Sequence, residues 1–217
     1  MSDSNRASVL LVRSGLTDWD CQGRMQGCAD LPLCEKGRAA AATDCAKLGA
    51  IHLALVLSGP DEACRSTAAL VAAATGKGKV KSVEDLRELG LGLWEGQREE
   101  ELEVRYASAY KAWRHDPAKI VPPEGESMTE AQDRLIEQVI KGIGRRRGPE
   151  GVGIVLRPFA MALVRARIFG LPIDQVWDKL ESSPCTEWVS VDMAELKLGR
   201  MAAVAASTQQ RQASAQR

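Results

Sequence analysis

Short apolar runs alternate with helical segments along most of this 217-residue chain. Residues 8–12, 53–57 and 151–156 are rich in valine, leucine or isoleucine and are bounded by polar or glycine-rich stretches, so they are predicted to be buried strands. A helical pattern follows each of them. Strands that alternate with helices of this length indicate a mostly parallel sheet with helices on both faces. We therefore expect an α/β fold, a three-layer αβα sandwich with a mostly parallel central sheet.

Local signals place the remaining elements. Helices are expected at residues 35–48, 61–75, 99–114, 127–147 and 158–169, and further strands at 80–83, 186–192 and 195–201. Ser127 and Glu130 have the spacing of a capping box, which predicts a helix start. Residues 202–217 have no apolar periodicity, so we expect one domain over residues 1–201 and a disordered tail over 202–217.

The ligand site of such a sheet lies beyond the carboxyl ends of its strands. Three segments meet that condition: residues 13–15 (Arg-Ser-Gly), 58–60 (Ser-Gly-Pro) and 157–158 (Arg-Pro). Arg13 lies at a strand end, and Gly15 allows close approach to the backbone. Both features suit a phosphate pocket, because phosphate is bound by the two parallel N–H donors of an arginine and by backbone N–H groups. The alternative interpretation of Arg13 is a surface salt bridge.

Three sequence blocks and a spaced arginine occur in the order of one known family. The first block contains Arg13, Gly15, Thr17, Trp19, Gly23, Arg24, Gln26, Gly27, Asp30, Pro32, Leu33 and Gly37. The second contains Leu86, Glu88, Gly92, Trp94, Glu95 and Gly96, and the third Pro123, Gly125, Glu126 and Ser127, followed by Arg134. The chain over residues 8–192 thus resembles the histidine phosphatase superfamily, the phosphoglycerate-mutase-like enzymes.

The resemblance implies phosphoryl transfer to a histidine in an Arg-His-Gly turn, with a second histidine in the same pocket. Ser14 occupies the first position and Arg157 the second. Serine is a poor nucleophile unless a base removes its proton, and arginine cannot accept that proton. Glu88 precedes a glycine-rich turn, where its carboxyl group could act as an acid or base. Arg13, Arg24 and Arg157 are the expected phosphate-binding residues.

Other pocket positions also differ from the pattern that the resemblance implies. Ala63 stands where a second pocket arginine is expected, and Arg65, two residues on, is a candidate replacement. Asp20 replaces an expected asparagine and would repel a phosphate. Pro158 lacks a backbone N–H at a helix start where an anion would bind, and Phe159 adds bulk beside it.

These departures leave three hypotheses open. The leading one is a catalytically impaired protein, a pseudophosphatase that binds a phosphorylated or carboxylated metabolite or a protein partner. The alternative is an active phosphomonoesterase or phosphoglycerate-mutase-like enzyme with a non-standard mechanism that uses Glu88. The third is an interaction scaffold whose pocket Phe159 closes.

The amino-acid composition limits the classes of binding partner that we expect. Lys plus Arg equals Asp plus Glu at 29 each, so the net charge of zero predicts neither nucleic-acid nor membrane binding. We expect no cofactor and no metal, because Cys21, Cys28 and Cys34 lack metal-site spacing. The chain has six cysteines without a CxxC pair and no evident export signal, which favours reduced thiols in a cytoplasm. The oligomeric state is predicted to be monomer or homodimer. The two histidines, His52 and His115, are expected to lie away from the pocket.

Overall fold

The computed structural model describes residues 5–49, 51–76, 79–144, 150–177, 180, 185–199 and 203–205. Within them a central sheet has the strand order β3-β2-β4-β1-β5-β6. The first four strands along the chain are mutually parallel where they pair, whereas β5 runs antiparallel to β1 and β6 antiparallel to β5. The mostly parallel sheet that the sequence predicted is therefore confirmed.

The described elements have the following bounds. The strands are β1 (Arg6–Arg13), β2 (Leu53–Ser58), β3 (Lys79–Ser82), β4 (Gly151–Leu156), β5 (Thr186–Asp192) and β6 (Ala203–Ala205). The α-helices are α1 (Asp18–Cys21), α2 (Glu35–Ala46), α3 (Glu62–Thr75), α4 (Glu99–Arg105), α5 (Ala107–His115), α6 (Met128–Ile143), α7 (Pro158–Phe169) and α9 (Met193–Lys197).

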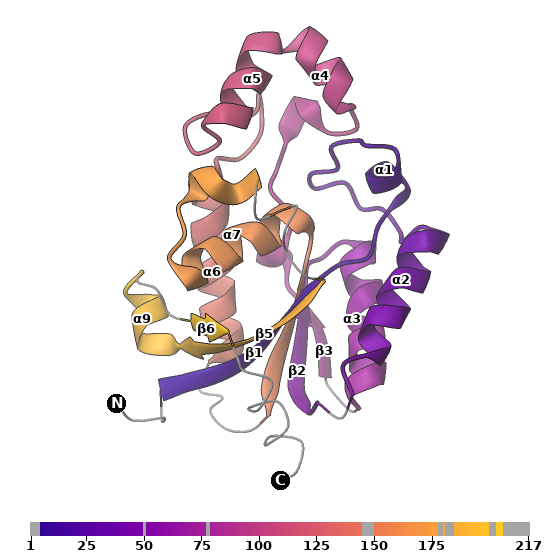
Figure 1. Ribbon diagram of the computed structural model, residues 1–217, viewed down its shortest axis with the longest axis vertical. Coiled ribbons are helices and arrows are strands. Elements are labelled where there is room, and N and C mark those ends of the chain that lie inside the picture. Colours follow the sequence, from indigo (N-terminus) through magenta and orange to yellow (C-terminus); the bar gives the residue numbers. More distant parts are fainter. Residues whose placement is uncertain are drawn as a thin grey trace.

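Helices cover both faces of the sheet, with α2 and α3 on one side and α6 and α7 on the other (Figure 1). The alternation of β1 explains this arrangement, because successive strand residues point to opposite faces. Leu10 and Val12 belong to the core shared with α3, whereas Val9 and Leu11 belong to the core shared with α6 and α7. Helices α4 and α5 stand beyond one end of the sheet (Figure 1).

Three predicted elements differ in the structure. The strand expected at 195–201 is wrong for residues 195–199, because Asp192 caps the backbone N–H groups of Ala194 and Glu195, and this cap starts helix α9; residues 200 and 201 lie outside the described part. The single helix expected at 99–114 is two helices, since Tyr106 has a non-helical backbone between them. Helix α6 ends at Ile143 rather than 147, at Gly144 with a positive φ; residues 145–149 lie outside the described part.

The expected boundary between domain and tail is also too early. Strand β6 (Ala203–Ala205) pairs with β5 through Val189, Ser190 and Val191, so the sheet continues into the segment that was expected to be disordered. Residues 206–217 lie outside the described residues. Among the helices that the structure describes, none is long and apolar enough to cross a membrane.

Candidate active site

The turns after β1 and β4 lie side by side because these strands are neighbours. Arg13 pairs with Leu156 at the end of the ladder, and the Ser14 backbone N–H donates to the Leu156 carbonyl at 2.8 Å. Arg157 follows directly and caps the start of α7. Its Nη1 donates to Ser14 Oγ at 3.1 Å. The structure thus brings together the two positions where the family resemblance implies histidines.

Arg157 is held in a closed ion pair rather than presented to a ligand. Its Nη2 lies 2.8 and 3.0 Å from the two carboxylate oxygens of Asp20 and 2.6 Å from Gln26 Oε1. The residue is only 2% exposed. Burial is the largest single influence and lowers the pKa of Arg157, but Asp20, Glu88 and Cys64 together raise it, so the net shift is upward and the side chain stays charged. The Asp20 carboxylate, which was expected to repel a phosphate, is therefore paired with an arginine.

Helix α1 fixes Asp20 in this position. Thr17 caps the helix, and Asp20 accepts from the Thr17 backbone N–H at 2.7 Å, which completes a capping box. Thr17 Oγ1 also donates to Gln26 Oε1 at 2.7 Å. Sequence reasoning missed this network. The sequence did contain a signal for this ion pair. Relative to the family pattern, position 20 carries an added negative charge and position 157 an added positive charge, and opposite charges can pair.

Glu88 occupies the amino end of α7. Its Oε1 accepts from the backbone N–H groups of Leu89 at 2.8 Å and Ala160 at 2.6 Å, and its Oε2 accepts from Phe159 N–H at 2.9 Å. Because helix starts bind anions, this carboxylate fills the place that a ligand anion would take. Burial raises the pKa of Glu88 to about 7, although Arg157 and the three N–H groups lower it.

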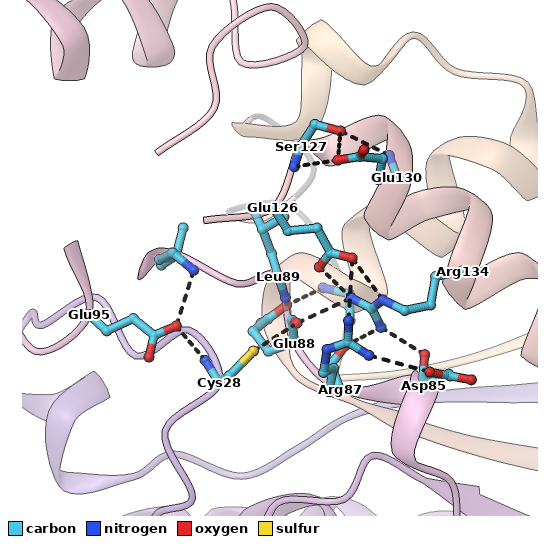
Figure 2. A network of polar contacts seen from close by, with 12 residues as sticks. Cys28, Asp85, Arg87, Glu88, Leu89, Glu95, Glu126, Ser127, Glu130 and Arg134 are labelled. Carbon is cyan, nitrogen blue, oxygen red and sulfur yellow. Dashed lines mark hydrogen bonds and ion pairs between the residues drawn. The ribbon is translucent and has the colours of Figure 1, made fainter. Parts of the chain in front are cut away.

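A second arginine supports the Glu88 segment from α6 (Figure 2). Arg134 forms a two-pronged ion pair with Glu126 at 2.9 and 2.6 Å. It also donates to the backbone carbonyls of Asp85 at 2.7 Å and Arg87 at 3.1 Å. The spaced arginine and the glutamate of the third sequence block therefore hold the backbone that leads to Glu88. The capping box of Ser127 and Glu130 is confirmed beside them.

A cavity of about 270 Å³ lies against this site. Asp20, Glu88 and Arg157 line it together with Arg24, Glu99, Arg114, Phe159 and Trp177, among others. Arg24 donates to the Gly96 carbonyl at 2.6 Å, so part of its guanidinium group is already engaged. Phe159 packs edge-on against Trp177, with ring centroids 5.5 Å apart, and forms part of the wall. Phosphate binding at Arg24 and Arg157 remains a prediction.

Two other predicted arginines lie elsewhere. Arg13 donates to Cys185 Sγ at 3.4 Å and lines a different cavity of about 130 Å³ beside α2, which Ser14 also lines. Arg65 donates to the Pro60 carbonyl and lies 3.6 Å from Asp30, lining a third cavity of about 330 Å³. Ala63 is fully buried. This third cavity shares Gly27 and Glu88 with the cavity that Arg157 lines, but Arg157 is not among its lining residues.

The remaining candidates are placed as follows. His52 and His115 are both exposed, and neither lines the cavities described above. Cys64 is fully buried. Cys185 is half-buried and accepts the hydrogen bond from Arg13. Within the described residues, no group of three or more His, Cys, Asp or Glu side chains is arranged to hold a metal ion.

Residues 9–206 match the family model described as the histidine phosphatase superfamily (branch 1). This match spans most of the chain, and the α/β fold with its mostly parallel sheet agrees with it. The chain therefore belongs to the histidine phosphatase superfamily.

Individual relatives carry phosphatase names. The chain is 29% identical over 190 residues to a glucosyl-3-phosphoglycerate phosphatase of Mycolicibacterium vanbaalenii, covering 84% of this chain and 83% of the relative. It is 25% identical over 169 residues to phosphoserine phosphatase 1 of Hydrogenobacter thermophilus, covering 78% and 79%. Among solved structures, Bacillus stearothermophilus YhfR superposes with a TM-score of 0.79 at 28% identity, covering 93% of this chain and 96% of the other.

Proposed function

We propose that this chain is a catalytically impaired member of its superfamily, a pseudophosphatase that acts by binding. The observation that carries the proposal is the ion pair between Arg157 and Asp20, which lies against Ser14 at the position implied for the nucleophile. A phosphoryl group cannot be transferred to a histidine here, because neither histidine of the chain lines the cavity at this site.

Ser14 is poorly placed to substitute as nucleophile. A serine attacks phosphorus only when a neighbouring base accepts its proton. Arg157 donates to Ser14 Oγ and remains protonated, so it cannot be that base. The proton of Ser14 therefore has no acceptor in this pair. Losing a general acid or base typically costs about 10²–10⁴ in rate, and losing the nucleophile removes the covalent route.

Binding is the function that the pocket can still support. The relatives named above are phosphatases of phosphorylated small molecules, so a phosphorylated or carboxylated metabolite is the ligand class that we propose, with a protein partner as the other option. An incoming anion competes with Asp20 for Arg157 and with Glu88 for the N–H groups of α7. Binding at this site thus requires Asp20 to release Arg157.

Hydrolysis of a generic aryl phosphate tests the proposal. Purified wild-type protein should show no more turnover than the Arg13→Ala and Ser14→Ala variants, each prepared identically. If the wild type exceeds both variants reproducibly, the chain is an enzyme and the proposal fails. A vanadate titration in parallel separates loss of turnover from loss of binding.

One observation favours a working enzyme as the second candidate. Glu88 lines the cavity, and burial brings its pKa to about 7, where a carboxyl group can both donate and accept a proton. Glu88 would then protonate the leaving group, while a water molecule or Ser14 attacked. This candidate requires measurable turnover that Glu88→Gln abolishes and that Glu84→Gln, at an exposed position nearby, leaves intact. Turnover unaffected by Glu88→Gln would exclude it.

A further inference from the structure

Two cysteine thiols lie in contact at the edge of the site. Cys21 Sγ and Cys34 Sγ are 3.5 Å apart, although the residues are separated by 13 positions in the sequence. Cys21 ends α1 and is exposed, whereas Cys34 precedes α2 and is half-buried. Sequence spacing gave no indication of this pair, because neither a CxxC motif nor a metal pattern is present.

The backbone holds these two thiols together. Thr17 and Leu33 form an antiparallel bridge, and the Cys34 backbone N–H donates to the Leu16 carbonyl at 3.0 Å. The segment that begins α1 is therefore tied to the segment that begins α2. Cys28, in the same loop, is a useful contrast, since its thiol instead donates to the Glu88 carbonyl at 3.4 Å.

We propose that Cys21 and Cys34 form a redox modification site, a dithiol that a low-molecular-weight disulfide oxidises to an intramolecular disulfide. The two sulfurs already face each other at 3.5 Å and must approach by about 1.5 Å to form a bond. The pair also meets the requirement of access, because Cys21 is exposed. The site does not depend on whether the chain turns over phosphate.

The two thiols have different parts in the reaction. Cys34 Sγ accepts the Gly37 backbone N–H at 3.2 Å, at the amino end of the 12-residue helix α2. The hydrogen bond with Cys34 raises the pKa of Cys21, while Lys36 nearby lowers it and Asp20 raises it, so Cys21 keeps its proton longer. Because the pKa of Cys21 is raised and the Cys34 sulfur already faces the amino end of α2, we assign the first attack to Cys34.

The reaction balances as two exchanges. Cys34 loses its proton to water, and its sulfur attacks one sulfur of the small disulfide, forms a mixed disulfide and expels one small thiolate, which takes up a proton. Cys21 then loses its proton to water and attacks the Cys34 sulfur, which expels the second small thiolate. Two protein thiols are oxidised, and one small disulfide is reduced to two thiols. The new bond would join the helix that carries Asp20 to α2.

Oxidised glutathione and mass spectrometry of the full chain test this site. The reduced wild type should lose two hydrogen atoms and yield a Cys21–Cys34 cross-linked peptide, while alkylation of these two thiols slows at least about tenfold. The Cys21→Ser variant should instead retain a stable mixed disulfide on Cys34. The Cys28→Ser variant, a matched change in the same loop, should form the cross-link as the wild type does.

Three results would overturn the proposal. The first is a wild type that keeps mixed disulfides on both cysteines without a cross-link. The second is a Cys28→Ser variant that cannot form the cross-link. The third is accumulation of the mixed disulfide on Cys21 in Cys34→Ser but not on Cys34 in Cys21→Ser, which would reverse the assigned order of attack.

Discussion

Two arginines lie close to Glu88, and the difference between them explains how this site is built. Arg134 pairs with Glu126 and donates to the backbone that leads to Glu88 (Figure 2). Arg157 pairs with Asp20 and lies against Ser14. The first belongs to a sequence block that agrees with the family pattern, whereas the second stands where that pattern implies a histidine.

The comparison shows that support and chemistry are separable. The contacts of Arg134 are the kind that a scaffold needs whether or not the pocket reacts, because they satisfy backbone carbonyls and a half-buried carboxylate. The contacts of Arg157 instead pair groups of the pocket with one another, since Nη1 donates to Ser14 Oγ and Nη2 donates to Asp20. A chain can therefore keep the fold of its superfamily while the charges in its pocket pair with each other.

Replacing Arg134 by methionine should have the largest effect on stability. The change leaves Glu126 only its longer ion pair with Arg87, at 3.7 Å, and removes the donor to the Asp85 and Arg87 carbonyls, so a loss of about 3 kcal/mol in the free energy of unfolding is expected. Urea denaturation measures it. Lys141→Met, on the same helix in an exposed pair with Glu137, should cost less than about 1 kcal/mol. Equal losses would contradict the supporting role of Arg134.

Glu88 should make stability depend on pH in a defined direction. Its pKa is raised in the folded state from 4.5 to about 7, so the folded protein holds an extra proton between these values. The stability contribution is fully present below about pH 4.5 and is lost as the pH rises through 7, by about 3 kcal/mol. Denaturant midpoints from pH 4.5 to 8 measure this loss, which Glu88→Gln should remove and Glu84→Gln should retain. An unchanged slope in Glu88→Gln would refute the assignment.

Breaking the ion pair between Asp20 and Arg157 should lower stability by less than the two changes above and should strengthen anion binding. Asp20→Asn leaves the Arg157 charge buried without its carboxylate, at a cost of about 2 kcal/mol, reduced because the Asp20 side chain is 17% exposed. The same change frees Arg157 for an anion, so vanadate should bind more tightly to the variant than to the wild type. Asp18→Asn, at an exposed position on the same helix, should do neither. Weaker vanadate binding in Asp20→Asn would show that Asp20 does not block the site.

Anion binding to the wild type should give the smallest effect. Glu88 occupies the N–H groups of α7 and Asp20 occupies Arg157, so vanadate at about 1 mM should raise the melting temperature of the wild type by less than that of Asp20→Asn at neutral pH. A thermal-shift titration measures this. A wild-type shift as large as that of Asp20→Asn, which Arg157→Met abolishes, would mean that the ion pair between Asp20 and Arg157 opens readily. The pair would then not close the pocket, in contrast to the role given to Arg157 above.

Much of the fold could be predicted from the sequence because it depends on local patterns. The apolar runs of β1 and β4 and the capping box at Ser127 survive in the structure with small changes in their ends. The closing segment was predicted wrongly, since alternating residues near Leu196 resemble a strand, whereas the cap at Asp192 starts a helix. A capping contact of this kind depends on how β5 ends, which a short pattern does not show.

The site was predictable as a location but not as a set of contacts. Ser14, Glu88 and Arg157 do meet at one end of the sheet, as the ends of neighbouring strands require. The ion pair of Asp20 with Arg157 spans 137 residues, and the contact of Cys21 with Cys34 depends on a bridge between two turns. Such contacts are long-range, so no local pattern reveals them, although complementary charges at positions 20 and 157 gave a usable hint.

The most direct test of the central claim is aryl phosphate turnover by the wild type beside the double variant Ser14→His with Arg157→His. We predict that the wild type does not exceed Ser14→Ala and that the double variant exceeds the wild type by about 10² or more. A double variant that stays inactive would place the impairment at Asp20, Ala63 and Pro158 as well. Wild-type turnover that Ser14→Ala abolishes would contradict the claim that this pocket no longer catalyses phosphoryl transfer.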